Sequence, residues 1–126
     1  QKLQAGRCFY CGGGLSGRGE VDHFIPWVRY PLDLGHNFVL AHGACNNDKR
    51  DTLASVLHLE NWILRNRSQD SRMQAYFGEH ALPADLPTTE SVAVWAYEQT
   101  ERNGGSVWGG KGKQLMGLNS VWRRCF

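Results

Sequence analysis

The sequence predicts an α+β fold in which a small β–β–α unit is followed by a mostly helical C-terminal region. Three observations predict it. Two pairs of metal-ligating residue types, each with two residues between its members, flank two apolar runs of strand length. From about residue 52, apolar residues recur at helical spacing instead. We therefore expect three segments, over residues 1–51, 52–103 and 104–126.

The first segment has the pattern of a β–β–α unit. Residues 20–26, Glu-Val-Asp-His-Phe-Ile-Pro, predict a short strand that Pro26 ends, because proline cannot donate a ladder hydrogen bond. Residues 38–41, Phe-Val-Leu-Ala, predict a second short strand after a proline-containing loop. The polar run over residues 45–50 lacks glycine and predicts the start of a helix.

The second segment is predicted to be helical. Apolar side chains spaced by three and four residues predict a helix over residues 52–66. A short helix is expected near residues 71–77, and a third over residues 88–102, where Gly104 is a natural stop. We expect Trp62 and Trp95 to pack in the core of this region.

The third segment is glycine-rich and basic. Residues 102–126 carry five basic and no acidic residues, although the whole chain has a net charge of only +2. Trp108 and Trp122 lie in this stretch, where they either grip nucleic acid or pack back onto the domain. Elsewhere, we expect His36 to lie in a loop and His58 on the surface.

The composition excludes several classes of protein. Hydrophobic residues make up 41% and charged residues 21%, as in an ordinary globular domain. No apolar run approaches the roughly 20 residues that a membrane span needs. The chain begins at Gln1 rather than Met and has no charged-then-apolar leader, so we expect an intracellular piece of a longer protein.

Two half-sites have the spacing of metal ligands. Cys8-x-x-Cys11 is followed by glycines, which allow the tight turn that brings two sulfurs to one point. His42-x-x-Cys45 is the second half-site, and together the pairs supply the three sulfurs and one imidazole of a closed structural Zn²⁺ site. The alternative is that Cys8 and Cys11 form a disulfide or remain free thiols. We expect Cys125 to be an ordinary thiol.

Residues suited to metal-assisted hydrolysis lie between and after the half-sites. The Asp22 carboxylate can hold a hard cation, and the His23 imidazole can take a proton from water near neutral pH. Asn46 follows a zinc ligand directly and offers a neutral oxygen to the same cation. Because neighbouring side chains on a strand point to opposite faces, we expect the strand to bend or break at His23.

These motifs, in this order, resemble the HNH endonucleases, also called His-Me finger or ββα-metal nucleases, in their zinc-stapled subgroup. The resemblance covers residues 7–51. One departure is the second half-site, which is commonly Cys-x-x-Cys in this subgroup and is His42-x-x-Cys45 here. The resemblance implies a small zinc-bound ββα-metal (HNH) core. It does not extend to the rest of the chain, where we expect residues 52–103 to form a helical support region and residues 104–126 a glycine-rich basic tail.

The resemblance also implies a mechanism for cleaving DNA. In this mechanism a histidine is the general base, an asparagine braces the loop behind it, and one Mg²⁺ or Mn²⁺ ion assists. The implied roles are catalysis by His23 and Asn37, binding of the Mg²⁺-type ion by Asp22 and Asn46, structural Zn²⁺ binding by Cys8, Cys11, His42 and Cys45, and contacts to DNA phosphates by Lys49 and Arg50.

The sequence leaves the biological setting open. One such site nicks one strand, so double-strand cleavage needs a second copy or a partner nuclease. The resemblance is compatible with restriction, defence or RNA-guided systems of a prokaryote or phage, with DNA and other domains or subunits as partners. Two alternatives remain: a zinc-ribbon-like module that binds nucleic acid or protein without cutting, and a disulfide-stabilised secreted domain.

Overall fold

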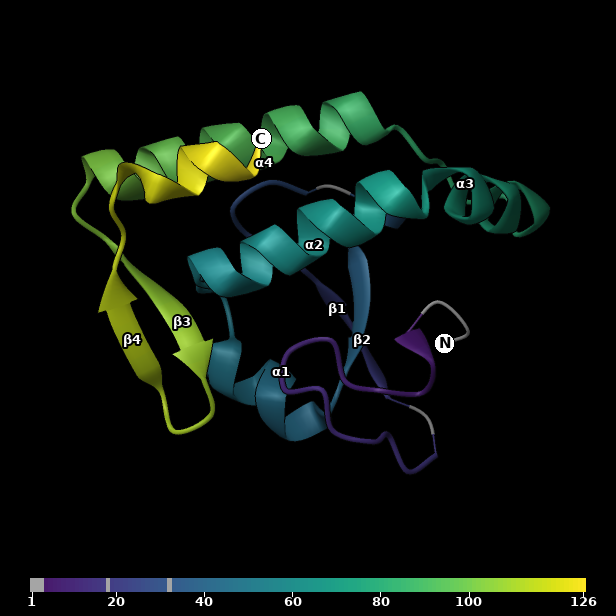
Figure 1. Cartoon of the computed structure of the whole chain (residues 1–126), viewed down its shortest axis with the longest axis horizontal. Coiled ribbons are helices and arrows are strands. Elements are labelled where there is room, and N and C mark those ends of the chain that lie inside the picture. The colour runs from purple at the N-terminus through teal and green to yellow at the C-terminus, as the bar shows by residue number, and fades with distance from the viewer. Residues whose placement is uncertain (1–3, 18, 32) are drawn as a thin grey trace.

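The computed structural model describes residues 4–17, 19–31 and 33–126 and contains a mixture of helices and short antiparallel strands (Figure 1). The elements in chain order are β1 (Glu20–His23), η2 (Gly35–Asn37), β2 (Phe38–Ala41), α1 (Gly43–Lys49), α2 (Val56–Ser68), α3 (Asp70–Glu79), α4 (Leu86–Arg102), β3 (Ser106–Gly110), β4 (Gln114–Gly117) and η3 (Ser120–Cys125). No helix within the described residues is long and apolar enough to cross a membrane.

Strands β1 and β2 form an antiparallel pair, and α1 follows directly. The register pairs Glu20 with Ala41 and His23 with Phe38. Strand β1 ends at His23, earlier than the expected Pro26, because residues 24–26 turn into the interior, where each is buried. The expected break at His23 is therefore confirmed, and β2 has the predicted bounds.

Helix α2 begins at Val56 and not at residue 52. The residues before it bond to the distant strand β3 instead: the Trp108 amide donates to the Leu53 carbonyl at 2.8 Å, and the Ser55 amide donates to the Trp108 carbonyl at 2.8 Å. These long-range hydrogen bonds compete with the first helical turn. Helix α4, in contrast, begins earlier than expected, at Leu86, since the Asp85 side chain accepts from the Thr88 amide and caps it.

The last 20 or so residues are an ordered part of the fold. Strands β3 and β4 form an antiparallel hairpin, and η3 packs against α2 and α4. Trp108 and Trp122 are each 1% exposed, so both tryptophans pack onto the domain and neither is available to grip nucleic acid. The glycines of this region serve the hairpin and are not part of a basic tail.

One hydrophobic core spans the whole chain, including both sides of residue 51. Figure 1 shows α2 between the C-terminal helical elements and the β1–β2 pair with α1. Phe24, which follows β1, stacks on Trp62 of α2 with ring centroids 4.4 Å apart. Two expectations were wrong: His58 is buried at 4% exposure, and Trp95 is 46% exposed because it lies on the outer face of α4.

Candidate functional site

Four metal-ligating side chains meet where the N-terminal loop contacts the start of α1. We call Cys8, Cys11, His42 and Cys45 the Cys/His cluster. Their ligand atoms all lie within 4.8 Å of one another, so the cluster can hold a metal ion. A tight turn brings the first two together, with the Gly12 amide donating to the Cys8 carbonyl at 2.9 Å. The structure therefore confirms that the two half-sites come together.

Hydrogen bonds around the cluster set the orientation of its ligands. His42 places Nδ1 3.3 Å from Cys11 Sγ, while its Nε2 lies 2.8 Å from the Gly14 carbonyl oxygen. A proton on Nε2 donated to that carbonyl leaves Nδ1 as the ligand atom, as is usual for metal-binding histidines. The four cysteines are all free thiols in this structure.

The thiols of the cluster differ in their electrostatics. Burial opposes ionisation of Cys8, but backbone hydrogen bonds from the 8–11 turn and His42 outweigh it and lower its pKa to about 7. Burial and the neighbouring sulfurs of Cys8 and Cys11 raise the pKa of Cys45 to about 12. A cation at the centre of the cluster relieves this repulsion between sulfurs, because it favours the thiolate form of every ligand.

A cleft of about 650 Å³ lies beside the cluster, between the end of β1 and one face of α1. Of the residues expected to act in catalysis or DNA binding, Asp22, His23, Asn46 and Arg50 all line it. The remaining lining residues are Pro26, Trp27, Val28, Asn47 and Asp51. The structure thus brings a carboxylate, an imidazole, an amide and a guanidinium to one cavity.

His23 lines this cleft and has a partner that the sequence did not predict. Its side chain is 29% exposed, and its Nε2 lies 2.9 Å from an Asp33 carboxylate oxygen. Asp33 lies in the loop between β1 and η2. When Nε2 carries the proton shared with Asp33, Nδ1 is the basic nitrogen. The ring also makes an edge contact with Phe38, at 5.0 Å between centroids.

Asn37 does not line the cleft but holds the backbone that follows His23. It is fully buried in η2, where its Oδ1 accepts from the Ile25 amide at 2.8 Å and its Nδ2 donates to the Ile25 carbonyl at 3.1 Å. The Asn37 carbonyl also accepts from the Phe24 amide at 2.8 Å. These three bonds fix the inward turn of residues 24–26.

Two residues hold the carboxylate of Asp22. Its Oδ2 accepts a hydrogen bond from the Tyr10 hydroxyl at 2.5 Å and lies 3.5 Å from the Lys49 ammonium. Burial and the nearby Asp22 raise the pKa of Tyr10 well above its usual value, so the phenol stays protonated and donates. Lys49 is 1% exposed, which corrects the expectation that it contacts DNA phosphates.

Asn46 and Arg50 come to the cleft from α1. Asn46 Nδ2 donates to a Glu20 carboxylate oxygen at 3.1 Å, so the first residue of β1 holds the amide. Arg50 ends α1 with a positive φ of 51° and is exposed. Of the two basic residues expected to meet phosphate, only Arg50 has its charge in the cleft.

No family model, curated protein or solved structure matches this chain.

Proposed function

We propose that this chain is a metal-dependent endonuclease module of the HNH type, which hydrolyses DNA phosphodiester bonds. One observation carries the proposal: Asp22 and His23 from β1 and Asn46 from α1 line the same cleft. A structural ribbon alone does not require that convergence. The resemblance of residues 7–51 to the HNH nucleases supports the same assignment.

The donor sets of the two sites fit different ions. Three thiols and an imidazole in close contact suit Zn²⁺, which takes sulfur and nitrogen ligands in a tetrahedron. The cleft offers a carboxylate and an amide oxygen, which are the ligands that Mg²⁺ and Mn²⁺ prefer. Tyr10 and Lys49 engage only Oδ2 of Asp22, so the other carboxylate oxygen is left to a ligand.

The residues of the cleft divide the remaining work. A bound Mg²⁺-type ion supplies Lewis-acid stabilisation of the negative charge on the phosphate and the departing oxygen. His23 accepts a proton from the attacking water, and the Asp33 carboxylate orients its ring and stabilises the imidazolium that forms. Asn37 keeps the backbone behind His23 in place. Arg50 donates to a phosphate at the rim of the cleft.

The substrate class follows from this set of groups. A cation and an exposed guanidinium are suited to a phosphodiester because they neutralise its negative charge. A base is suited to it because it activates the water that attacks the phosphorus. One cleft attacks one strand, so we expect the isolated chain to nick plasmid DNA. By the resemblance, the products carry 5′-phosphate and 3′-hydroxyl ends.

The test is nicking of a supercoiled plasmid in Mg²⁺ or Mn²⁺, with EDTA as the negative control. We expect His23→Ala to lower the nicking rate on the order of 10²- to 10⁴-fold while Zn²⁺ content and melting temperature stay unchanged. The matched control is His80→Ala, which changes an exposed histidine at the end of α3.

Nicking by His23→Ala at the rate of the unmodified chain would contradict the proposal. Plasmid binding without nicking by the unmodified chain would favour the alternative of a zinc-held module that binds without cutting.

A further inference from the structure

We propose that Tyr10 is a positioning residue that links the Cys/His cluster to the cation site of the cleft. The inference rests on the proposed function and deepens it. Tyr10 lies between Cys8 and Cys11 in the sequence, inside the turn that supplies two ligands of the cluster. The hydroxyl of the same residue donates to Asp22, the carboxylate of the cleft. One side chain therefore connects the two sites.

The Tyr10 ring is held firmly by the core. It is 7% exposed and makes edge contacts with His58 and Trp108 at centroid distances of 5.4 and 5.2 Å, and it stacks with Phe24 at 6.4 Å. The backbone of the residue is fixed on the other side by the 8–11 turn. Because both ends are fixed, the hydroxyl has one position, and that position is against Asp22.

Lys49 completes the arrangement at the same carboxylate oxygen. Its Nζ lies 3.5 Å from Asp22 Oδ2 and 5.7 Å from the centre of the Tyr10 ring. The Nζ has no hydrogen-bond partner among the described residues, so Asp22 is the counter-charge that its burial requires. Both partners contact Oδ2 of Asp22, and Asp22 itself lines the cleft, so its carboxylate is shared between these partners and the cleft.

This arrangement makes the two sites dependent on one another. Asp22 can present a fixed oxygen to a cation only while the Tyr10 hydroxyl is in place, and Tyr10 is in place only while the 8–11 turn is closed. Groups that hydrogen-bond to a metal-binding carboxylate commonly change metal affinity by a factor of about 10 to 100 when they are removed. A filled Cys/His cluster therefore strengthens binding of the ion in the cleft.

The experiment measures Mn²⁺ binding to the zinc-loaded full chain without DNA, from the EPR signal of free Mn²⁺. We expect Tyr10→Phe to raise the Kd for Mn²⁺ about 10-fold, since it removes the hydroxyl and keeps the ring. The matched control is Tyr97→Phe, which removes another buried hydroxyl, bonded to the Ala54 carbonyl at 2.6 Å, and should leave the Kd unchanged. Asn46→Ala should weaken binding and so assigns the measured ion to the cleft.

A second measurement needs no variant. Mn²⁺ bound beside Asp22 should broaden the NMR resonances of the Tyr10 ring at concentrations that leave those of Tyr97 sharp.

The outcomes separate this inference from the function on which it rests. Equal Mn²⁺ affinity of Tyr10→Phe and the unmodified chain, or sharp Tyr10 resonances with the ion bound, would overturn the inference and leave the nuclease proposal standing. An unmodified chain that binds no Mn²⁺, or an Asn46→Ala variant that binds it as tightly, would overturn the cation site and both proposals with it.

Discussion

Residues 4–51 and residues 52–126 are stabilised in different ways, although they share one core. The first region takes polar groups into its interior: the Cys/His cluster, the Asn37 side chain and the Asp22–Lys49 pair. The second region buries a larger set of apolar side chains, with Trp62 and Tyr97 fully buried, and its buried polar residues carry no fixed charge: Ser55, His58, Asn66, Thr89 and Thr100. The difference indicates that the first region holds the Cys/His cluster and the buried charge, and that the second region provides the apolar mass that such a polar unit lacks.

The contacts between the regions support the same division. From α2, Arg65 donates to the Phe38 and His36 carbonyls at 3.0 and 2.7 Å, and Trp62 Nε1 donates to the His36 carbonyl at 3.0 Å. These bonds reach the backbone on either side of Asn37, which in turn holds the segment behind His23. The helical region therefore acts on the cleft through the backbone of η2 and β2.

Removal of Zn²⁺ is expected to produce the largest difference in stability between the two regions. A structural zinc site contributes on the order of 10 kcal/mol of folding free energy. The Cys/His cluster that could hold it lies entirely in the first region. We expect chelation to remove hydrogen-exchange protection from β1, β2 and α1 while α4 keeps much of its own. Cys125→Ser is the control, because this cysteine lies outside the cluster and should leave Zn²⁺ stoichiometry unchanged. An equal loss of protection in α4 would mean that both regions rely on the ion.

The Asp22–Lys49 pair tests whether buried charge distinguishes the first region. Asp22→Asn leaves the Lys49 ammonium buried without a counter-charge, and we expect it to lower the free energy of unfolding by about 3 kcal/mol. The double variant Asp22→Asn/Lys49→Met should recover most of this loss in urea unfolding, yet fail to nick DNA. A double variant no more stable than the single one would show that the pair is not the cause.

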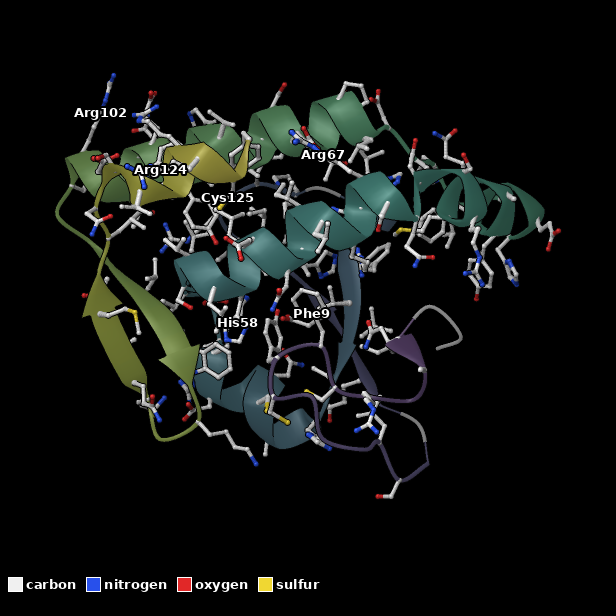
Figure 2. All side chains as sticks on the ribbon, in the orientation of Figure 1. Phe9, His58, Arg67, Arg102, Arg124 and Cys125 are labelled. Atoms are coloured by element: carbon white, nitrogen blue, oxygen red, sulfur yellow. The ribbon has the colours of Figure 1, made fainter. Side chains whose placement is uncertain are left out.

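The smallest expected effect is a pH dependence at the boundary between the regions. Figure 2 shows His58 on the side of α2 that faces α1 and β3. Burial lowers the pKa of His58 below its usual 6.5, with Lys49 adding to the effect and the Gly109 carbonyl opposing it. As the pH falls, the unfolded chain therefore takes up a proton on His58 before the folded chain does. The contribution of buried, neutral His58 to the free energy of unfolding is complete above pH 6.5 and is lost as the pH falls.

His58→Phe should flatten the dependence of unfolding free energy on pH between 7.5 and 5.5, measured with urea at fixed Zn²⁺. Protonation of the cluster ligands affects both proteins equally and cancels in the difference. Parallel curves for the variant and the unmodified chain would show that His58 does not cause the pH dependence of the unfolding free energy.

The sequence predicted the features that depend on local spacing. The two half-sites have a spacing that forces their members together once each turn forms, and β2 is a short apolar run bounded by polar residues. The sequence did not predict the partners that come from distant loops. Asp33 reaches His23 from a loop whose path no pattern encodes, and Leu53 bonds to β3 across more than 50 residues of chain.

The direction of a side chain on a helix was the other source of error. Lys49 is the last residue of α1 and Arg50 follows it; the two were assigned one role, but Lys49 is buried in the core and Arg50 lines the cleft. Which face of α1 is buried depends on its packing against β3, where Asp48 accepts a hydrogen bond from Trp108 Nε1 at 2.8 Å. A short polar helix has no apolar stripe to indicate that face.

The stacking of Phe24 on Trp62 has a consequence for anyone who wishes to transplant this unit into another protein. The segment that turns inward behind His23 rests on an aromatic surface supplied by α2, and that surface is not encoded within the first 51 residues. A graft that ends there would expose a phenylalanine to water and free the backbone that sets the imidazole. The smallest transferable piece therefore includes α2, and a chimera built with it should keep its geometry.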